Sequence, residues 1–252
     1  MRKRTISIAK TNSNAPATGA SDAACGWATL ATGVAISGFL LWRNHQPMDF
    51  NEYNLLNTAL ILFVPLVVIL LLLRREASDF GMTPGDLKGG VIAALLLFVA
   101  FIPILLLFAP MDGPQEYYLN WLGEGSGSGS IRGLFFDGRH WSKGGTIEWA
   151  RLAYHELTMA FYMFGWEWFY RGFLLFGLSR LLPIWGAVGV QTLLFAALHW
   201  GKPLPETLSS LPGGVLMALL ALRYRSFLPC FLLHTLISAG FDAAVLYNHF
   251  YK

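Results

Sequence analysis

The sequence is poor in charge. Only 13% of its 252 residues are Asp, Glu, Lys or Arg, whereas 55% are hydrophobic; a soluble domain carries about 25% charged residues. This composition excludes an ordinary soluble domain and predicts an integral membrane protein. At roughly 20 residues per crossing, the chain length predicts an all-α, polytopic transmembrane helix bundle of about seven spans, within a range of six to eight.

Cysteine and net charge are low as well. The two cysteines, Cys25 and Cys230, lie in apolar surroundings and form neither a disulfide framework nor a metal-ligand spacing. The formal net charge of +3 gives no basis for a nucleic-acid partner. The basic start is not followed directly by an apolar core, which is not typical of a cleaved signal peptide. Residues 1–24 are therefore predicted to form a disordered cytoplasmic tail.

Long apolar runs divide the rest of the chain. Residues 25–109 are predicted to form N-terminal transmembrane helices, residues 110–148 an extramembrane loop with a Gly/Ser run, and residues 149–252 a second set of transmembrane helices. The predicted spans are 25–42, 55–73, 90–109, 149–179, 184–200, 210–222 and 227–247.

Two of these spans are unusual. The run 149–179 would be roughly 45 Å long if wholly helical, so we expect it to tilt, to break near Gly165 or to begin as a helix that lies on the membrane surface. The run 210–222 is short and starts with Pro212-Gly213-Gly214, so we expect an irregular or re-entrant beginning. With seven spans, a cytoplasmic N-terminus puts more Lys and Arg residues inside than outside, as the positive-inside rule requires.

Polar residues inside three of the predicted spans indicate a functional site. Glu167 stands four residues before Arg171, and His199 and His234 lie in later spans. Ionisable groups at membrane depth are costly and are by default functional. Counted from the inner ends of their spans, the acid and the two histidines reach similar heights of roughly 14 to 22 Å. We therefore expect them to converge on one polar site.

The residue types in this site suit hydrolysis of a peptide bond. A carboxylate and an imidazole can hold a water between them and take its proton, and a second imidazole with a hydroxyl can donate to the oxyanion. This assigns Glu167 as general base, His199 as its water-holding partner and Arg171 as the orienting group. His234 and Ser238, one helical turn apart, would be the oxyanion donors.

Four further polar residues are predicted to mark the entrance to the site from the outer side. Asp242 continues the stripe of His234 and Ser238 at four-residue spacing. Glu156, Lys202 and Glu206 are expected near the outer interface. Together they would meet an exported or membrane-anchored substrate rather than a cytosolic one.

Other interpretations of these residues remain. The Glu167–Arg171 pair also fits a structural ion pair. His199, which Trp200 follows, also fits an interfacial histidine, and His234 also fits a helix–helix hydrogen bond. His199, His234 and Glu167 also match a two-histidine, one-carboxylate metal site. No His-Glu-x-x-His motif is present, and Arg171 disfavours a bound cation, so no cofactor is expected, although a divalent metal stays an alternative.

At these residues the chain resembles the CPBP family of intramembrane proteases, which includes the type II CAAX-prenyl endopeptidases and the bacterial Abi or bacteriocin-processing proteins. The family pattern is Glu-Glu-x-x-x-Arg, then Phe-x-x-x-His, then His-x-x-x-Asn. Here these read Trp166-Glu167-x-x-x-Arg171, Phe195 to His199 and His234 to Ser238. The resemblance covers about residues 80–245, including Phe80-Gly81-Met82 and Gly213-Gly214.

Two positions depart from the family pattern. Trp166 replaces the first glutamate, which the resemblance implies is the water-activating one in eukaryotic-type members, so Glu167 would have to serve instead. Ser238 replaces the usual asparagine and still offers one hydrogen bond. A bacterial branch of the family shares the Trp-Glu-aromatic form and the stretch from Gly201 to Glu206.

The sequence thus predicts an intramembrane endopeptidase, a hydrolase of the bacterial cytoplasmic (inner) membrane. Its expected partners are a peptide or protein substrate in the membrane and the lipid bilayer; the oligomeric state is left open. The main alternative is a non-catalytic membrane chaperone, immunity or scaffold protein on the same fold. A third class, a solute or proton-coupled transporter, is disfavoured because the sequence shows no paired repeats.

Overall fold

The computed structural model describes residues 19–122 and 149–251, and every regular element in these two ranges is a helix. The all-α prediction is confirmed. The predicted tail up to residue 18 and the Gly/Ser run 125–130 lie outside the described residues. The helices are α1 (Asp22–Arg43), α2 (Phe50–Thr58), η1 (Ala59–Phe63), α3 (Val64–Val67), η2 (Val68–Leu72), η3 (Ala77–Phe80), α4 (Leu87–Phe108), α5 (Asp112–Leu122), α7 (Trp149–Glu167), η5 (Trp168–Leu174), α8 (Leu175–Leu178), α9 (Ile184–Ala197), α10 (Leu204–Tyr224) and α11 (Leu228–Tyr251).

Several helices begin at a residue whose side chain caps the first free backbone amides. Ser21 Oγ accepts from the amide of Ala24 at 3.2 Å before α1. Asp49 and Asp86 do the same before α2 and α4. A helix start leaves backbone N–H groups without partners, and short oxygen-bearing side chains satisfy them. These caps fix where the apolar runs begin as helices.

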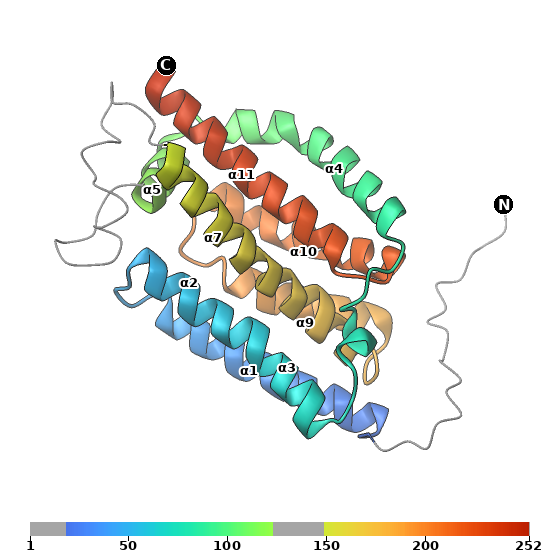
Figure 1. The fold of residues 1–252 in the computed structure, drawn as a ribbon. Coiled ribbons are helices and arrows are strands. Elements are labelled where there is room, and N and C mark those ends of the chain that lie inside the picture. Colours follow the sequence, from blue (N-terminus) through green and yellow to red (C-terminus); the bar gives the residue numbers. More distant parts are fainter. Residues whose placement is uncertain (1–18, 123–148, 252) are drawn as a thin grey trace.

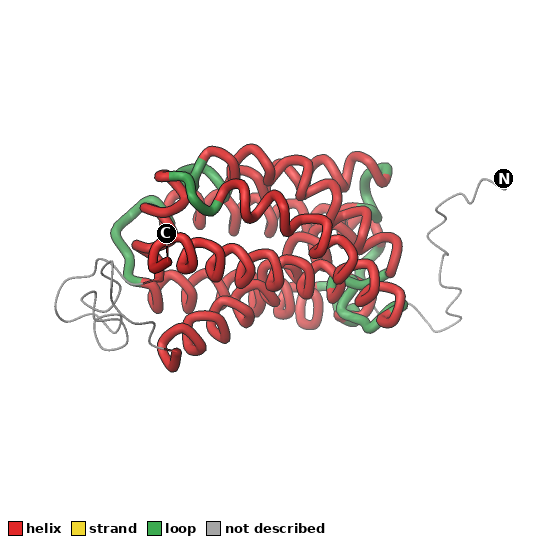
Figure 2. The backbone as a smooth tube through the Cα atoms, turned by 90° about the horizontal axis from the view of Figure 1, so that it is seen from above, coloured by secondary structure: helices red, strands yellow, loops and turns green. Residues whose placement is uncertain are grey.

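The helices form a bundle with α7 and its continuation at the centre. Figure 1 shows α1 and the α2–α3 helix on one side of α7, and α11 with α4 on the other. Helix α9 packs against α10, and α1 packs against α8 and α9. Figure 2, viewed from above, shows the helices side by side with connections at both ends. The central position of α7 brings its polar residues within reach of α11.

The bundle carries the surface of a membrane protein. Five of the described helices are long and apolar enough to cross a bilayer: α1, the continuous run 51–72, α4, α10 and α11. Only 11% of the most apolar window of α4 is buried, and this helix exposes Leu96 and Val99 among other large apolar side chains. Such a surface is stable in lipid rather than in water. The protein is an integral membrane protein, as the composition predicted.

The structure differs from three expectations drawn from the sequence. The segment that contains Pro212-Gly213-Gly214 is not irregular: α10 runs unbroken from Leu204 to Tyr224. The extramembrane loop 110–148 contains a helix, α5, in its described part. The long run 149–179 does not break near Gly165; it changes from α-helical to π-helical winding after Glu167.

Two glycines of the family motifs stand where the backbone or a neighbour requires them. Gly81 ends η3 with φ +86°, and a Cβ there would lie 2.5 Å from the Phe176 ring. Gly214 faces α9, where a Cβ would lie 2.8 Å from Thr192 Cγ2. A residue with a side chain is therefore excluded at 81 by conformation and contact, and disfavoured at 214 by the close approach of α9 and α10.

Candidate functional site

The acid of the site lies where α7 becomes a π-helix. Glu167 is the last residue of α7, and Arg171 belongs to the π-helical segment η5. Arg171 Nε lies 3.3 Å from Glu167 Oε2, and both side chains are fully buried. The Arg171 guanidinium also lies over the Phe195 ring, 4.0 Å from its centroid. Such widened turns inside helices are frequent at functional sites.

Glu167 joins α7 to α11 through a histidine. His234 Nδ1 lies 2.6 Å from Glu167 Oε1. A carboxylate oxygen accepts, so Nδ1 of the ring donates and its other nitrogen, Nε2, is left for a further partner. Each carboxylate oxygen of Glu167 thus has a partner: Arg171 contacts Oε2 and His234 contacts Oε1. The buried charge is compensated, as burial of an ion requires.

A cavity of about 610 Å³ lies beside this pair. Its walls are mostly apolar, with α4 contributing Phe101 and Phe108 among others. Its ionisable and hydroxyl lining is His155, Glu206, Lys202, His199, His234, Ser238, Asp242, Ser209, Ser210 and four tyrosines, Tyr53, Tyr117, Tyr118 and Tyr162. This size and this mixture of a large apolar wall with a few polar groups are typical of a ligand-binding site.

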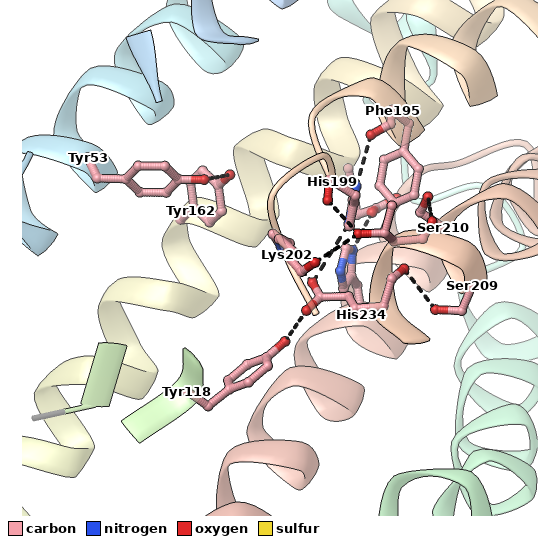
Figure 3. Close-up of polar contacts among 12 residues, drawn as sticks. Tyr53, Tyr118, Tyr162, Phe195, His199, Lys202, Ser209, Ser210 and His234 are labelled. Atoms are coloured by element: carbon pink, nitrogen blue, oxygen red, sulfur yellow. Dashed lines mark hydrogen bonds and ion pairs between the residues drawn. The ribbon is translucent and has the colours of Figure 1, made fainter. Parts of the chain in front are cut away.

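His199 reaches the cavity from the connection between α9 and α10 (Figure 3). Its Nδ1 lies 2.9 Å from the carbonyl oxygen of Phe195, and its ring packs on the Phe195 ring at 4.4 Å between centroids. Burial, and then the positive charge of Lys202, lower the pKa of His199 to about 3. The ring is therefore neutral at physiological pH.

A second carboxylate stands on the His199 side of the cavity. Glu206 Oε1 lies 2.7 Å from Lys202 Nζ and 4.0 Å from His199 Nε2. Glu206 Oε2 accepts from the Tyr118 hydroxyl at 2.6 Å, and Figure 3 shows Tyr118 approaching from α5. Burial, and then the Glu206 carboxylate, raise the pKa of Tyr118 well above its usual value, so this hydroxyl stays a donor.

A third polar cluster lies along the contact of α7 with α11. His155 Nε2 lies 3.4 Å from Asp242 Oδ2, and both side chains are buried. Ligand atoms of His155, Glu156 and Asp242 lie within 4.8 Å of one another, so these residues could hold a metal ion. The sequence assigned Glu156 and Asp242 to the entrance but missed His155; its position in an apolar span, beside Glu156, was the available signal.

The structure brings the predicted residues together with a different pairing. The imidazole on Glu167 is His234, whereas His199 bonds to Phe195 and faces Glu206. Of the described residues, the carboxylates on the cavity are Glu206 and Asp242, while Glu167 lies fully buried behind the wall. His234, Ser238 and Asp242 all line the cavity, as their four-residue spacing predicted.

Fold and site together define a class of protein: a helical membrane protein with a buried polar site beside a mainly apolar cavity. Residues 148–240 match the family described as type II CAAX prenyl endopeptidase Rce1-like. This match confirms the family resemblance that the motifs indicated. It runs from the start of α7 into α11 and includes every predicted site residue except Asp242. Comparisons with curated proteins and with solved structures gave no match.

Proposed function

We propose that the protein is an intramembrane endopeptidase that hydrolyses a peptide bond of a membrane-associated or exported substrate. The observation that supports this proposal best is the meeting of two imidazoles, His199 and His234, on one mainly apolar cavity, each with a carboxylate beside it. Peptide hydrolysis needs a base for the attacking water and donors for the oxyanion. The cavity offers groups for both tasks.

His234 and Ser238 suit the oxyanion. The Glu167 carboxylate accepts a hydrogen bond from Nδ1 of His234 at 2.6 Å. In this proposal Nε2 also carries a hydrogen when it binds the oxyanion, and the Ser238 hydroxyl lies one turn further along α11. Arg171 keeps Glu167 ionised and fixed. In this arrangement Glu167 acts through His234 rather than on the water itself, because its carboxylate is closed off from the cavity.

His199 suits the attacking water. Its Nδ1 is used by Phe195, so the free Nε2 lone pair of the neutral ring accepts a hydrogen bond from a water in the cavity. The apolar walls suit a hydrophobic peptide segment, whose scissile carbonyl would lie between the two histidines. The proposed setting is a bacterial cytoplasmic membrane with the N-terminus of the chain in the cytoplasm.

The proposal is tested with protein reconstituted in liposomes. The probe is a pooled library of synthetic peptides, each with one apolar segment of about 20 residues, incubated in H₂¹⁸O and analysed by mass spectrometry. Hydrolysis places ¹⁸O in each new carboxyl terminus. We expect cleavage by the wild-type protein and a loss of about 100-fold or more for Glu167→Gln, which keeps the shape but removes the charge behind His234.

A matched control and two opposing outcomes make this test decisive. Glu116→Gln changes an exposed carboxylate on α5 and should cleave as the wild type does. A non-catalytic chaperone or scaffold, which Trp166 beside His199 would favour, would bind peptides without ¹⁸O incorporation. A proton-coupled transporter would instead move solute, with pH dependence altered in Glu167→Gln. Either result would overturn the protease proposal.

A further inference from the structure

The proton on the His199 ring can be placed from its hydrogen bond. A backbone carbonyl only accepts, so the 2.9 Å contact with Phe195 puts the hydrogen of the neutral ring on Nδ1. Nitrogen Nε2 then carries a lone pair and points to Glu206 Oε1 at 4.0 Å. Two acceptors therefore face each other at a distance too long for a direct hydrogen bond.

A water molecule is the simplest group that satisfies both acceptors. It has two hydrogens, one for His199 Nε2 and one for Glu206 Oε1, and a position within hydrogen-bond reach of both atoms fits beside a 4.0 Å gap. Both residues line the cavity. A water held in this way has its lone pairs free to face a substrate carbonyl.

The rest of the surroundings hold the Glu206 carboxylate in place. Lys202 donates to Oε1 at 2.7 Å and Tyr118 donates to Oε2 at 2.6 Å. Each carboxylate oxygen can accept more than one hydrogen bond, so a lone pair remains for the water. The side chain is 24% exposed, whereas Glu167 is fully buried. Glu206 is thus both fixed and reachable.

Position 166 on α7, which precedes Glu167 in the chain, carries no acid. Trp166 packs with its ring centroid 6.0 Å from that of His199, so a side chain at 166 projects beside the same imidazole. The family pattern has an acidic residue there, and this chain has a buried tryptophan that cannot take a proton. The carboxylate beside His199 comes instead from α10.

We propose that Glu206 is the general base of the reaction, acting on a water shared with His199 in place of an acid at position 166. This inference rests on the proposed protease function. The water oxygen attacks the scissile carbonyl carbon while one water proton passes to Glu206. The carbonyl π electrons move to oxygen, where His234 and Ser238 stabilise them. The C–N bond then breaks, Glu206 returns its proton to the leaving amine, and a carboxylic acid and an amine are the products.

The first test compares Glu206→Gln with Glu116→Gln in the liposome assay, using a peptide that the wild-type protein cleaves. The amide keeps an oxygen acceptor for Lys202 or Tyr118 but cannot take a proton. Removal of a general base should lower kcat about 100-fold or more with KM unchanged. The Glu116 variant should match the wild type, and melting temperatures in detergent report whether each variant is folded.

The second test moves the acid back to α7. In the double variant Trp166→Glu/Glu206→Gln the carboxylate again lies beside His199, and kcat should rise about tenfold over Glu206→Gln alone. Tyr118→Phe removes one contact of Glu206 without changing its charge and should cost less than about tenfold. A merely structural Glu206 predicts the reverse: Tyr118→Phe as damaging as Glu206→Gln, and no gain from the acid at 166.

The outcomes separate this inference from the function on which it rests. If the Glu206→Gln variant cleaves as fast as the wild-type protein, the proposed role of Glu206 is overturned but the protease function is not. Cleavage lost in Glu206→Gln and regained in the double variant would support it. Absence of ¹⁸O-labelled products with the wild-type protein would overturn the protease function, and the role of Glu206 with it.

Discussion

His199 lies between a cation and a carboxylate, and this position sets the pH range in which it can accept a hydrogen bond from water. Three ionisable groups act on it: Lys202, Glu206 and His234. Burial lowers the pKa of His199 most, the ammonium of Lys202 lowers it further, and the Glu206 carboxylate raises it. The ring therefore stays neutral well below pH 6.

The Lys202→Gln variant should therefore lose activity at a higher pH than the wild-type protein when the solution is made more acidic. Without the nearby positive charge, the pKa of His199 rises from its lowered value, and a larger fraction of rings is protonated at a given acidic pH. We expect the acidic fall in kcat/KM to move to higher pH in this variant. A profile measured from about pH 2.5 to 8 checks this expectation, because it includes the pKa of about 3 that His199 has in the wild type. An unchanged fall, or one moved to lower pH, would contradict the assignment of the Lys202 charge.

At the scale of single residues, the sequence predicted which side chains come to one region better than which of them touch. Helix rise gives the height of Glu167, His199 and His234 along their helices, and all three do come to one region. The direction in which each side chain points depends on helix rotation, on the π-helical turn after Glu167 and on the loop that carries His199. Sequence spacing does not report these orientations. It therefore paired Glu167 with His199, whereas the structure pairs Glu167 with His234.

Neighbouring glycines on α10 give a matched test of packing at the scale of elements. A Cβ at Gly214 would lie 2.8 Å from Thr192 on α9, whereas a Cβ at Gly213 meets nothing within 4 Å. Alanine in a helix interior is favoured over glycine by about 1 kcal/mol. We expect Gly213→Ala to keep or raise the melting temperature in detergent and Gly214→Ala to lower it.

Equal melting temperatures for the two variants would show that α9 and α10 can separate without cost. The same helix shows the limit of local sequence rules. Pro212-Gly213-Gly214 predicted an irregular start, because both residue types disfavour helix interiors in water. In the bundle, Gly214 lets α9 approach closely, and that packing outweighs the local cost.

Features of the fold that depend on the local sequence could be predicted, whereas features that depend on tertiary packing could not. Long apolar runs predicted the positions of the five candidate spans among the described residues, since hydrophobic length is a property of the chain itself. The winding change at Trp168, the helix α5 within the predicted loop 110–148 and the place of His155 beside Asp242 depend on tertiary packing. For that reason they are visible only in the structure.

For the whole molecule, the side of the membrane to which the cavity opens is a measurable consequence of the proposed topology. If the chain crosses the membrane seven times, as its apolar runs predict, and the N-terminus is cytoplasmic, as proposed, the connection between α9 and α10 would lie on the outer face, together with Ser209 near the start of α10. Ser209 is exposed and lines the cavity. The native thiols Cys25 and Cys230 are buried and give little background.

Ser209→Cys should thus react with a membrane-impermeant maleimide in right-side-out spheroplasts and not in inverted vesicles. Labelling followed by mass spectrometry measures both. Reaction in inverted vesicles alone would place the cavity on the cytoplasmic side and reverse the proposed topology. The proposed chemistry of the site does not depend on this result.

The location of Glu167 and Arg171 on one continuous helical run has a consequence for biogenesis. An isolated charge entering lipid is costly, but these two opposite charges stand four residues apart and neutralise each other within the same segment. The segment can therefore leave the translocation machinery as a nearly neutral unit before its neighbours arrive. His234 lies 67 residues further along the chain, on α11, so it completes the contact only after α9 and α10 have been synthesised.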